Sequence, residues 1–430
     1  MQFYVIILKN RKIDIVSFVL MLCISVGSVA QNHLNSPYSR FGMGEMMSRT
    51  SASVKAMGGT GYTFQSSTAI NFINPASYMG FDTLSFLLDA GFSWKNHTLI
   101  AATTQRGNTF QFEYLSIGFS ITRWWKMALG VQPYSVMNYS TVEEMQTADT
   151  MKYKRLTSGD GGINEVFWGN SFKLFKNFSL GVNASFLFGT YSKNRIIEEW
   201  SDNDFFNSKI ENYTKIKGAV VTVGAQYFIP VKEKGEFGLG FVYTPPIPIQ
   251  GTENTTISTY WGTGYTIKEI DTLYPVAPKK HTYTMPTQIG GGISWGKKYK
   301  YFVGVDFTWK NWSRYKIDKI NDSLSDSYKI AIGGSYTPNY TSNKYFSRMT
   351  FTLGANVGQT HLFLAGEHLN QFGINFGVLF PLKKSKSGFG IVLEYGQMGT
   401  TKNNLIKENY FSATINLRIH ERWYQRTKLD

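Results

Sequence analysis

The residues best suited to chemistry are few, and their spacing matches no familiar catalytic arrangement. Residues 291–298 read Gly-Gly-Ile-Ser-Trp-Gly-Lys-Lys, which comes close to a phosphate-binding loop. The hydroxyl residue that should follow the lysine is missing, and the segment continues into a strand pattern where such a loop needs a helix. The stretch therefore favours a lumen-facing strand that ends in a basic turn.

Metal-binding and nucleophilic residue types are scattered as well. No Gly-x-Ser-x-Gly elbow occurs. Asp306 and Glu394 stand at inward strand positions, where we expect them to pair with cations such as Lys310 or Arg418. We therefore expect no catalysis, no metal and no cofactor. The six histidines have neither i, i+4 nor zinc-finger spacing, and no carboxylate cluster accompanies them: His33, His97, His281, His361, His368 and His420.

The elements that carry these residues are defined by a period of two. Over residues 301–310, bulky Tyr, Val, Val, Phe and Trp alternate with Phe, Gly, Asp, Thr and Lys. Such alternation predicts a strand whose faces meet different surroundings. Aromatics make up 16% of the chain, and many of its 41 glycines fall inside the apparent strands. Bulky apolar side chains outside and small or polar ones inside predict a transmembrane antiparallel β-barrel. A soluble multi-sandwich protein is the alternative.

Fourteen such segments follow one another, and an even number suits a closed antiparallel barrel. Odd-to-even connections, among them 251–280, are mostly longer and polar, whereas even-to-odd connections are mostly tight. The alternation changes phase in the second segment, which predicts a bulge near Tyr114. The segments are 84–94, 109–123, 125–142, 157–174, 178–194, 210–230, 236–250, 281–296, 300–312, 326–337, 348–359, 370–381, 388–398 and 408–421.

The chain begins with the three-part pattern of a secretory signal at residues 1–30. A basic start over 9–12 precedes an apolar stretch over 15–26, and Ala30 ends a small-residue cleavage site. The apolar stretch is short for a membrane anchor, which is the alternative. The only cysteine, Cys23, lies in this segment, so the mature chain is expected to form no disulfide.

The chain is strongly basic, with a formal net charge of +15. Much of this charge sits in short turns such as 297–300 and 383–386, separated by long strands. A nucleic-acid-binding protein would gather the charge on one face, so no nucleic acid is expected. The simpler interpretation is contact of the barrel with the lipid bilayer and its anionic lipid headgroups.

Residues 31–83 show little alternation and are too few for a robust independent core. They are predicted to plug the lumen or to form a tether on the periplasmic side. Within them, Ala56-Met57-Gly58-Gly59-Thr60, followed by Asn71 and Asn74-Pro75-Ala76, resembles the N-terminal hatch of the FadL/TodX-like transporters of long-chain fatty acids and aromatic hydrocarbons. Further segments similar to that family follow in family order: 240–246, Met285-Pro286 before Gly290, and 305–313 with Asp306, Trp309 and Trp312.

The resemblance implies passive uptake of small hydrophobic molecules through a fourteen-stranded outer-membrane barrel. Ligand would pass a lumen site blocked by the hatch and leave through a gap in the wall at the third strand. Gly130 and Pro133 lie in that strand, and proline removes a donor from the ladder. A bulge without function at Pro133 is an equal alternative. The hatch would be shaped by Gly58, Gly59, Asn71, Asn74 and Pro75.

The expected start of the mature chain, residues 35–42, departs from the family. It is similar to outer-membrane proteins of gliding, protein-secreting bacteria, in which transporter-like barrels have become subunits of secretion or barrel-assembly machines. Two functions therefore stay open. An uptake channel predicts an apolar pocket between plug and wall. A non-transporting subunit with protein partners predicts a filled lumen and a protein-contacting surface on the 251–280 loop, with Tyr260, Trp261 and Tyr265.

The expected organisation is a signal at 1–30, a plug at 31–83, a barrel at 84–421 and a tail at 422–430. Because an even number of strands returns the chain to its starting side, both mature termini are expected in the periplasm. The expected location is the outer membrane of a Gram-negative bacterium.

Overall fold

The computed structural model describes residues 36–146, 152–199, 206–231, 234–261, 268–318, 320–321, 324–382 and 385–422. The expected signal segment, most of the expected tail and Tyr265 lie outside the described residues.

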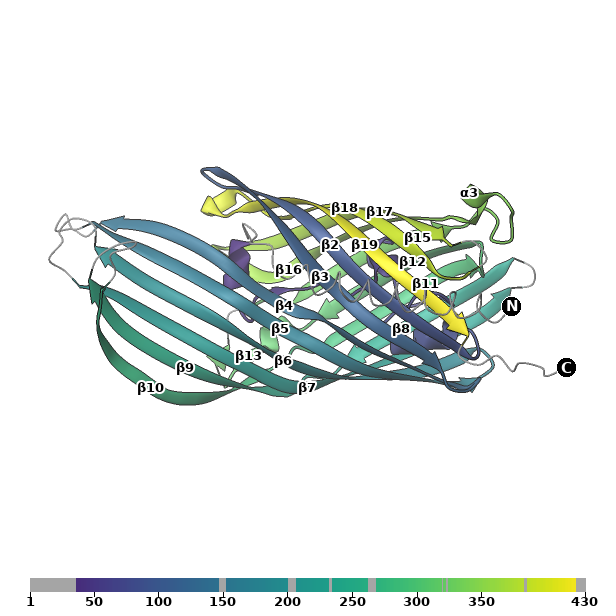
Figure 1. Cartoon of the computed structure of the whole chain (residues 1–430), viewed down its shortest axis with the longest axis horizontal. Helices are drawn as coiled ribbons and strands as arrows, with labels where there is room; N and C mark the ends of the chain where they lie inside the picture. Colours follow the sequence, from purple (N-terminus) through teal and green to yellow (C-terminus); the bar gives the residue numbers. More distant parts are fainter. Residues whose placement is uncertain are drawn as a thin grey trace, which may run out of the picture. The chain divides into compact units, whose positions relative to one another are not determined.

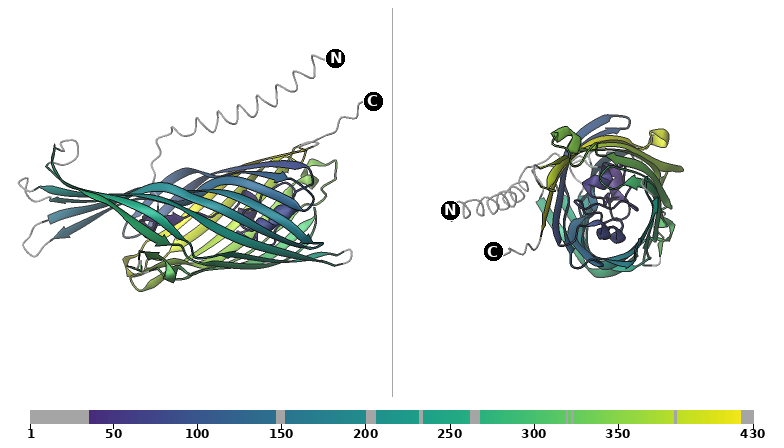
Figure 2. Two further views of the ribbon diagram at one scale, coloured as in Figure 1. Left: turned by 90° about the horizontal axis from the view of Figure 1, so that it is seen from below. Right: turned by 90° about the vertical axis from the view of Figure 1, so that its right-hand side faces the viewer.

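The described chain forms a closed antiparallel barrel of fourteen wall strands, as predicted (Figures 1 and 2). The last strand pairs with the first from Lys407↔Ile100 to Arg422↔Ser85, which closes the wall. The wall strands are β2 (Ser85–Ile100), β3 (Thr104–Ser120), β4 (Trp125–Gln146), β5 (Lys152–Phe175), β6 (Phe178–Glu199), β7 (Asn207–Val231), β8 (Gly235–Thr244) continued by β9 (Pro248–Trp261), β10 (Lys268–Thr284) continued by β11 (Gln288–Lys297), β12 (Tyr301–Lys310), β15 (Ser327–Tyr336), β16 (Thr350–Leu364), β17 (Glu367–Pro381), β18 (Gly388–Gly399) and β19 (Lys407–Arg422).

Two wall strands are interrupted. The breaks at 245–247 and 285–287 contain Pro245, Pro246 and Pro286. Proline cannot donate to the ladder, so pairing stops there and resumes beyond it. Short elements fill the connections: β13 (Lys316–Ile317), β14 (Ile320–Asn321), η5 (Trp312–Arg314), α3 (Tyr345–Arg348) and η6 (Lys402–Asn404).

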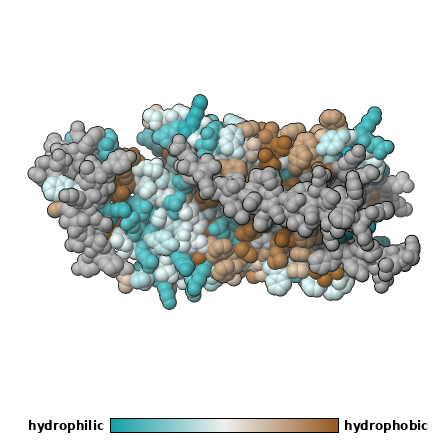
Figure 3. Space-filling view, viewed as in Figure 1, coloured by the Kyte–Doolittle hydropathy of each residue, from teal (hydrophilic) through white to brown (hydrophobic). Residues whose placement is uncertain are grey.

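The alternating side chains separate as the period of two requires. On β12, Val303 and Phe307 are 52% and 49% exposed, whereas Asp306 between them is 2% exposed. Figure 3 shows an apolar band around part of the barrel and a polar surface beyond one edge of that band. The bulge is confirmed: Gly91 pairs with Tyr114 but Phe92 pairs with Phe112, so the extra residue is Glu113.

The near phosphate-binding stretch lies in β11, an antiparallel strand between β8 and β12. The strand and turn expected there are confirmed, because the backbone of residues 288–297 is engaged in ladders on both sides.

The predicted long loop over 251–280 is wrong. β9 and β10 pair from Thr284↔Pro248 to Lys268↔Trp261 and form a hairpin that extends the wall. Because this hairpin reaches past the apolar band, neither face needs bulky apolar residues, and alternation could not reveal it. Tyr260, expected on a protein-contacting loop, is 3% exposed and donates its hydroxyl to Glu198 Oε1.

Residues 36–81, called the hatch from here on, lie inside the ring of strands (Figure 2, right). Their elements are η2 (Pro37–Arg40), β1 (Glu45–Met46), α2 (Ala52–Lys55) and η3 (Pro75–Gly80). Their apolar side chains share one buried core with the wall: Ile70, Phe72, Tyr78 and Phe81 of the hatch with Leu87, Tyr114 and Phe167 of the strands.

Candidate functional site: the closed lumen

The hatch backbone packs directly on wall glycines. A Cβ on Gly354 would lie 2.5 Å from Met57 O and nearer still to Met57 C, and one on Gly333 would lie 2.6 Å from Met57 C. Gly58 has φ +70°, a conformation that L side chains rarely adopt, and a Cβ there would lie 2.7 Å from Ala355 N. These wall glycines therefore let the two backbones meet without an intervening side chain.

A buried carboxylate holds the turn that follows α2. Asp306 Oδ2 accepts the backbone N–H groups of Gly61 at 2.6 Å and of Tyr62 at 2.8 Å. The Tyr62 hydroxyl shares a hydrogen bond of 2.8 Å with Thr308 on the same wall strand. Burial raises the pKa of Tyr62 to about 12, so the phenol stays protonated at neutral pH. One wall strand thus holds the hatch through two side chains.

A buried lysine fastens α2 to the opposite part of the wall. Lys55 Nζ lies 3.0 Å from Glu113 Oε1 and 3.6 Å from Glu394 Oε2. Burial alone would lower the pKa of Lys55, but the two carboxylates outweigh it and raise the pKa above its ordinary value. At the start of the same helix, Ala52 N–H donates to the Tyr114 hydroxyl at 3.0 Å.

Arg49 makes a third attachment. Its Nη1 lies 3.3 Å from Glu165 Oε2, and that oxygen also accepts from Gln132 Nε2 at 3.0 Å. The guanidinium lies 4.9 Å from the ring centroid of Tyr134. Three separate charged contacts therefore join residues 49–62 to the wall.

Two cavities lie on opposite sides of this segment. The first has a volume of about 360 Å³ and is lined by Lys55, Gly59 and Tyr62 of the hatch. The second, of about 550 Å³, is lined by Ala56 and Met57. Neighbouring residues of one hatch segment therefore line both cavities, so this segment lies between them.

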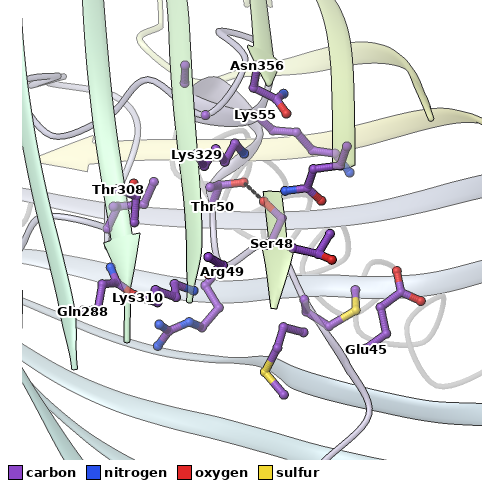
Figure 4. A pocket seen from close by; sticks show the side chains of 18 of the residues that line it. Glu45, Ser48, Arg49, Thr50, Lys55, Gln288, Thr308, Lys310, Lys329 and Asn356 are labelled. Atoms are coloured by element: carbon purple, nitrogen blue, oxygen red, sulfur yellow. Dashed lines mark hydrogen bonds between the residues drawn. The ribbon is translucent and has the colours of Figure 1, made fainter. Parts of the chain in front are cut away.

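The first cavity has a mixed lining, unlike the apolar pocket that an uptake channel predicts. Phe72 and Leu362 contribute apolar surface, but Lys310, Lys329 and Arg49 also face the space (Figure 4). Within the part of the chain that the structure describes, no carboxylate lies within ion-pair distance of either lysine. Pockets for hydrophobic ligands are lined predominantly by apolar side chains, so this cavity suits a hydrocarbon poorly.

The wall is incompletely paired next to the hatch. β3 and β4 pair only from Ser120↔Lys126 to Leu115↔Val131. Beyond that point hatch strand β1 takes the place of β3, with Met46↔Ser135 and Glu45↔Val136. The ladder between β4 and β5 shifts register between Pro133 and Ser135. Gly130 and Pro133, proposed from the sequence to mark a wall opening, therefore flank the point where β3 leaves β4.

The hatch residues singled out in the sequence lie close together. Asn71 Nδ2 donates to Gly61 O at 2.6 Å, and Asn74 Nδ2 donates to Tyr62 O at 2.7 Å. Pro75 begins η3, next to Asn74. The remaining two, Gly58 and Gly59, form the turn after α2, with φ +70° and +97°.

The wall motif residues serve different purposes. Trp312 is 3% exposed and stacks on His361 at a centroid distance of 4.5 Å, whereas Trp309 is partly exposed on β12. The pairings expected for the two lumen carboxylates are wrong. Asp306 binds hatch amides instead of Lys310, and Glu394 binds Lys55 and the Tyr410 hydroxyl instead of Arg418. The hatch lies inside the lumen and brings closer partners to these carboxylates than the wall offers.

Sequence reasoning missed Arg49, Lys55, Glu113 and Glu165. One signal was present, since Glu113 is the extra residue of the bulge that the phase change predicted. The others carry no periodic signal, because the path of the hatch sets their partners.

Helices long and apolar enough to cross a bilayer are missing from the described residues. A family model described as BamG matches residues 11–430. No curated protein matches the chain.

Several solved structures share the fold. The CymD monoaromatic hydrocarbon channel is similar over 90% of this chain and 100% of its own, with a TM-score of 0.56 and 12% identity. The P. putida toluene transporter TodX is similar over 87% of this chain and 98% of its own (TM-score 0.58, 12% identity). A Pseudomonas aeruginosa FadL homologue is similar over 87% of this chain and 98% of its own (TM-score 0.56, 12% identity). The FadL/TodX-like resemblance is thereby confirmed as a likeness of fold, and these neighbours are channels, not enzymes. The described wall has the fold of an outer-membrane β-barrel.

Proposed function

This chain belongs to the BamG family, and we propose that it is a non-transporting subunit of an outer-membrane protein-assembly or secretion complex. The observation that carries the proposal is the lining of the first lumen cavity, which includes Lys310 and Lys329 where an uptake channel predicts an apolar pocket. Residues 49–62 lie between the two lumen cavities and are fastened through Lys55, Asp306 and Arg49 to different parts of the wall. A hatch in the lumen also fits an uptake channel, so the cationic lining of the cavity is what separates the two candidate functions.

The proposed orientation has both mature termini in the periplasm. β2 begins and β19 ends at the same end of the barrel, because they pair antiparallel with Ser85 opposite Arg422. The long polar extensions of the wall lie at the other end, as long external loops do in such barrels. In this orientation the basic turn around Lys298 and Lys300 meets the inner headgroups, and we expect anionic lipids to contact it.

Gentle purification tests the main proposal. The tagged chain, extracted from native outer membranes in mild detergent, is expected to bring down at least one stoichiometric partner protein. Native mass spectrometry of the same sample is expected to show the complex with no amphiphile bound in the lumen. A solitary barrel carrying one bound hydrophobic molecule would contradict the proposal.

The second candidate is uptake of small hydrophobic molecules, and the incomplete pairing of β3 and β4 favours it. Ligand would leave the lumen for the bilayer beside Gly130 and Pro133. The test is uptake of radiolabelled oleate or toluene into cells that express the chain, compared with cells that lack it. This candidate requires a clear difference; equal uptake excludes it.

A further inference from the structure

Six neighbouring strands of the wall continue past the apolar band as an open sheet. The sheet runs β4, β5, β6, β7, β9 and β10, and its strands reach farther than the other wall strands in Figure 1. β3 pairs with β4 only up to Val131, and the bonds of β10 on its outer side are confined to residues 282–284 among the described residues. The sheet therefore ends in two edges, one on β4 and one on β10.

The hatch already uses the first part of the β4 edge. Tyr134 O accepts from Met47 N at 3.0 Å, and β1 pairs with Ser135 and Val136. Asn138 N–H donates to Ser39 Oγ at 3.2 Å, and the same hydroxyl donates to Asn138 O at 3.1 Å. These contacts show that the even-numbered residues turn their backbone groups away from β5.

The same edge continues without a partner. The pairing of β4 with β5 is regular from Ser135↔Ile163 to Gln146↔Lys152. Because backbone groups alternate in direction along an antiparallel strand, Ser140, Val142 and Glu144 also present N–H and C=O away from β5. No strand among the described residues pairs with them there.

The two edges differ in how they are protected. β10 shifts register against β9 between Glu269 and Asp271, between Thr272 and Tyr274, and between Val276 and Lys279. It also contains Pro278 followed by two lysines. Bulges, proline and lysine are the devices that keep exposed edges from pairing with other chains. Over residues 139–146 β4 has no bulge, proline or lysine, and its only charged residues are Glu143 and Glu144.

We propose that residues 140–146 of β4 form a docking edge to which an extended segment of a partner protein adds as a further strand. The edge lies beyond the apolar band, where lipid is not the neighbour, and its free groups are those that strand addition uses (Figure 3). Val142 is 58% exposed, and the Glu144 side chain is 67% exposed while its Oε1 lies 3.7 Å from Lys154 Nζ on β5. The incoming strand is therefore expected to place a β-branched residue against Val142 and a basic residue against Glu144.

This inference rests on the proposed subunit function. Amide hydrogen exchange tests the docking edge separately from that function. Exchange is measured residue by residue in native outer-membrane vesicles and in the isolated barrel. In the isolated barrel the amides of Ser140, Val142 and Glu144 are expected to exchange fast, while those of Thr141 and Glu143, bonded to β5, are slow. In vesicles all five are expected to be slow.

Each outcome of the exchange measurement either supports or overturns the docking edge. Fast exchange at the even positions in vesicles would overturn the docking edge even if a partner co-purifies. Equal new protection of β10 residues 277–282 would indicate general covering by neighbouring protein and would also overturn it. Protection at the even positions without any co-purifying partner would uphold the edge and contradict the proposed subunit function.

A pair of variants supplies the second measurement. Ser140→Pro with Val142→Pro removes two edge N–H groups but no N–H used by β5. Ser140→Ala with Val142→Thr changes the same side chains and keeps both N–H groups. The proline variant is expected to reduce partner recovery about tenfold and the control variant to leave it unchanged. Heat-modifiable gel mobility verifies that both barrels fold, and equal recovery from two folded barrels would refute the proposal.

Discussion

A methyl group on Gly354 is expected to lift the hatch from the wall. The added Cβ of Gly354→Ala would lie 2.5 Å from Met57 O, where ordinary contact begins at 3.4 Å, so the hatch must retreat by at least about 0.9 Å. Neighbouring Gly58, at φ +70°, also packs closely on the wall, since a Cβ there would lie 2.7 Å from Ala355 N. Overpacking of this kind costs roughly 2 kcal/mol. If this free energy destabilises the closed hatch relative to the open hatch, the fraction of molecules with an open hatch rises about 30-fold.

Thiol labelling measures that fraction directly, because the expected mature chain has no cysteine. Val54→Cys places a reporter thiol in α2 at a position that is 0% exposed when the hatch is closed. Gly291→Ala is the matched control, since its added Cβ would have no atom nearer than 3.9 Å. Labelling of the reporter thiol in the Gly354→Ala barrel at the rate of the Gly291→Ala barrel would refute the argument that wall glycines hold the hatch in place.

Three further changes test the remaining attachments. Asp306→Ala removes the acceptor of two hatch amides and is expected to increase labelling at position 54 about 30-fold, whereas Asp306→Asn keeps an acceptor oxygen and should do less. Lys55→Met leaves Glu113 with a buried unpaired charge and should lower the free energy of unfolding by about 3 kcal/mol in urea titrations. A hydrogen bond from His420, with Lys386 nearby, holds the pKa of Asp82 below its usual range. That contribution is complete above the unfolded pKa near 4 and is lost as pH falls below it. Asp82→Asn should therefore cost about 1 kcal/mol at pH 7, seen in thermal melts, and progressively less as the pH falls from 4 toward the lowered folded-state pKa of Asp82.

The wall strands were predictable because alternate residues of each strand face lipid or the lumen. Odd positions of β12 meet lipid and even positions meet the lumen, so alternation alone locates that strand. In β3 the alternation changes phase, and this change locates the bulge at Glu113. Outside the apolar band this rule stops. Residues 251–261 and 277–280 show no sustained alternation of apolar and polar side chains, so their hairpin looked like a loop.

The lumen was predictable only in part. Asp306 and Glu394 were placed inside correctly, but their partners Gly61 and Lys55 lie hundreds of residues away along the chain. A period of two specifies which face a side chain occupies. It does not specify which part of an irregular hatch will lie opposite, and that choice follows from backbone contacts at glycines such as Gly354.

The closed lumen and the proposed docking edge share one segment of chain. Ser39 and β1 occupy the β4 edge up to Asn138, and the next part of the hatch, from Arg49 to Tyr62, closes the lumen. A strand added at Ser140 would extend the ladder that already holds β1, and neighbouring ladder bonds stabilise one another. Partner binding is therefore expected to slow labelling of the reporter thiol at position 54, and the open form of the hatch is expected to bind the partner more weakly by the same factor, because coupling between two sites is reciprocal. If the partner leaves labelling at position 54 unchanged in a barrel that it binds, the edge and the hatch act independently, and the single-segment argument fails.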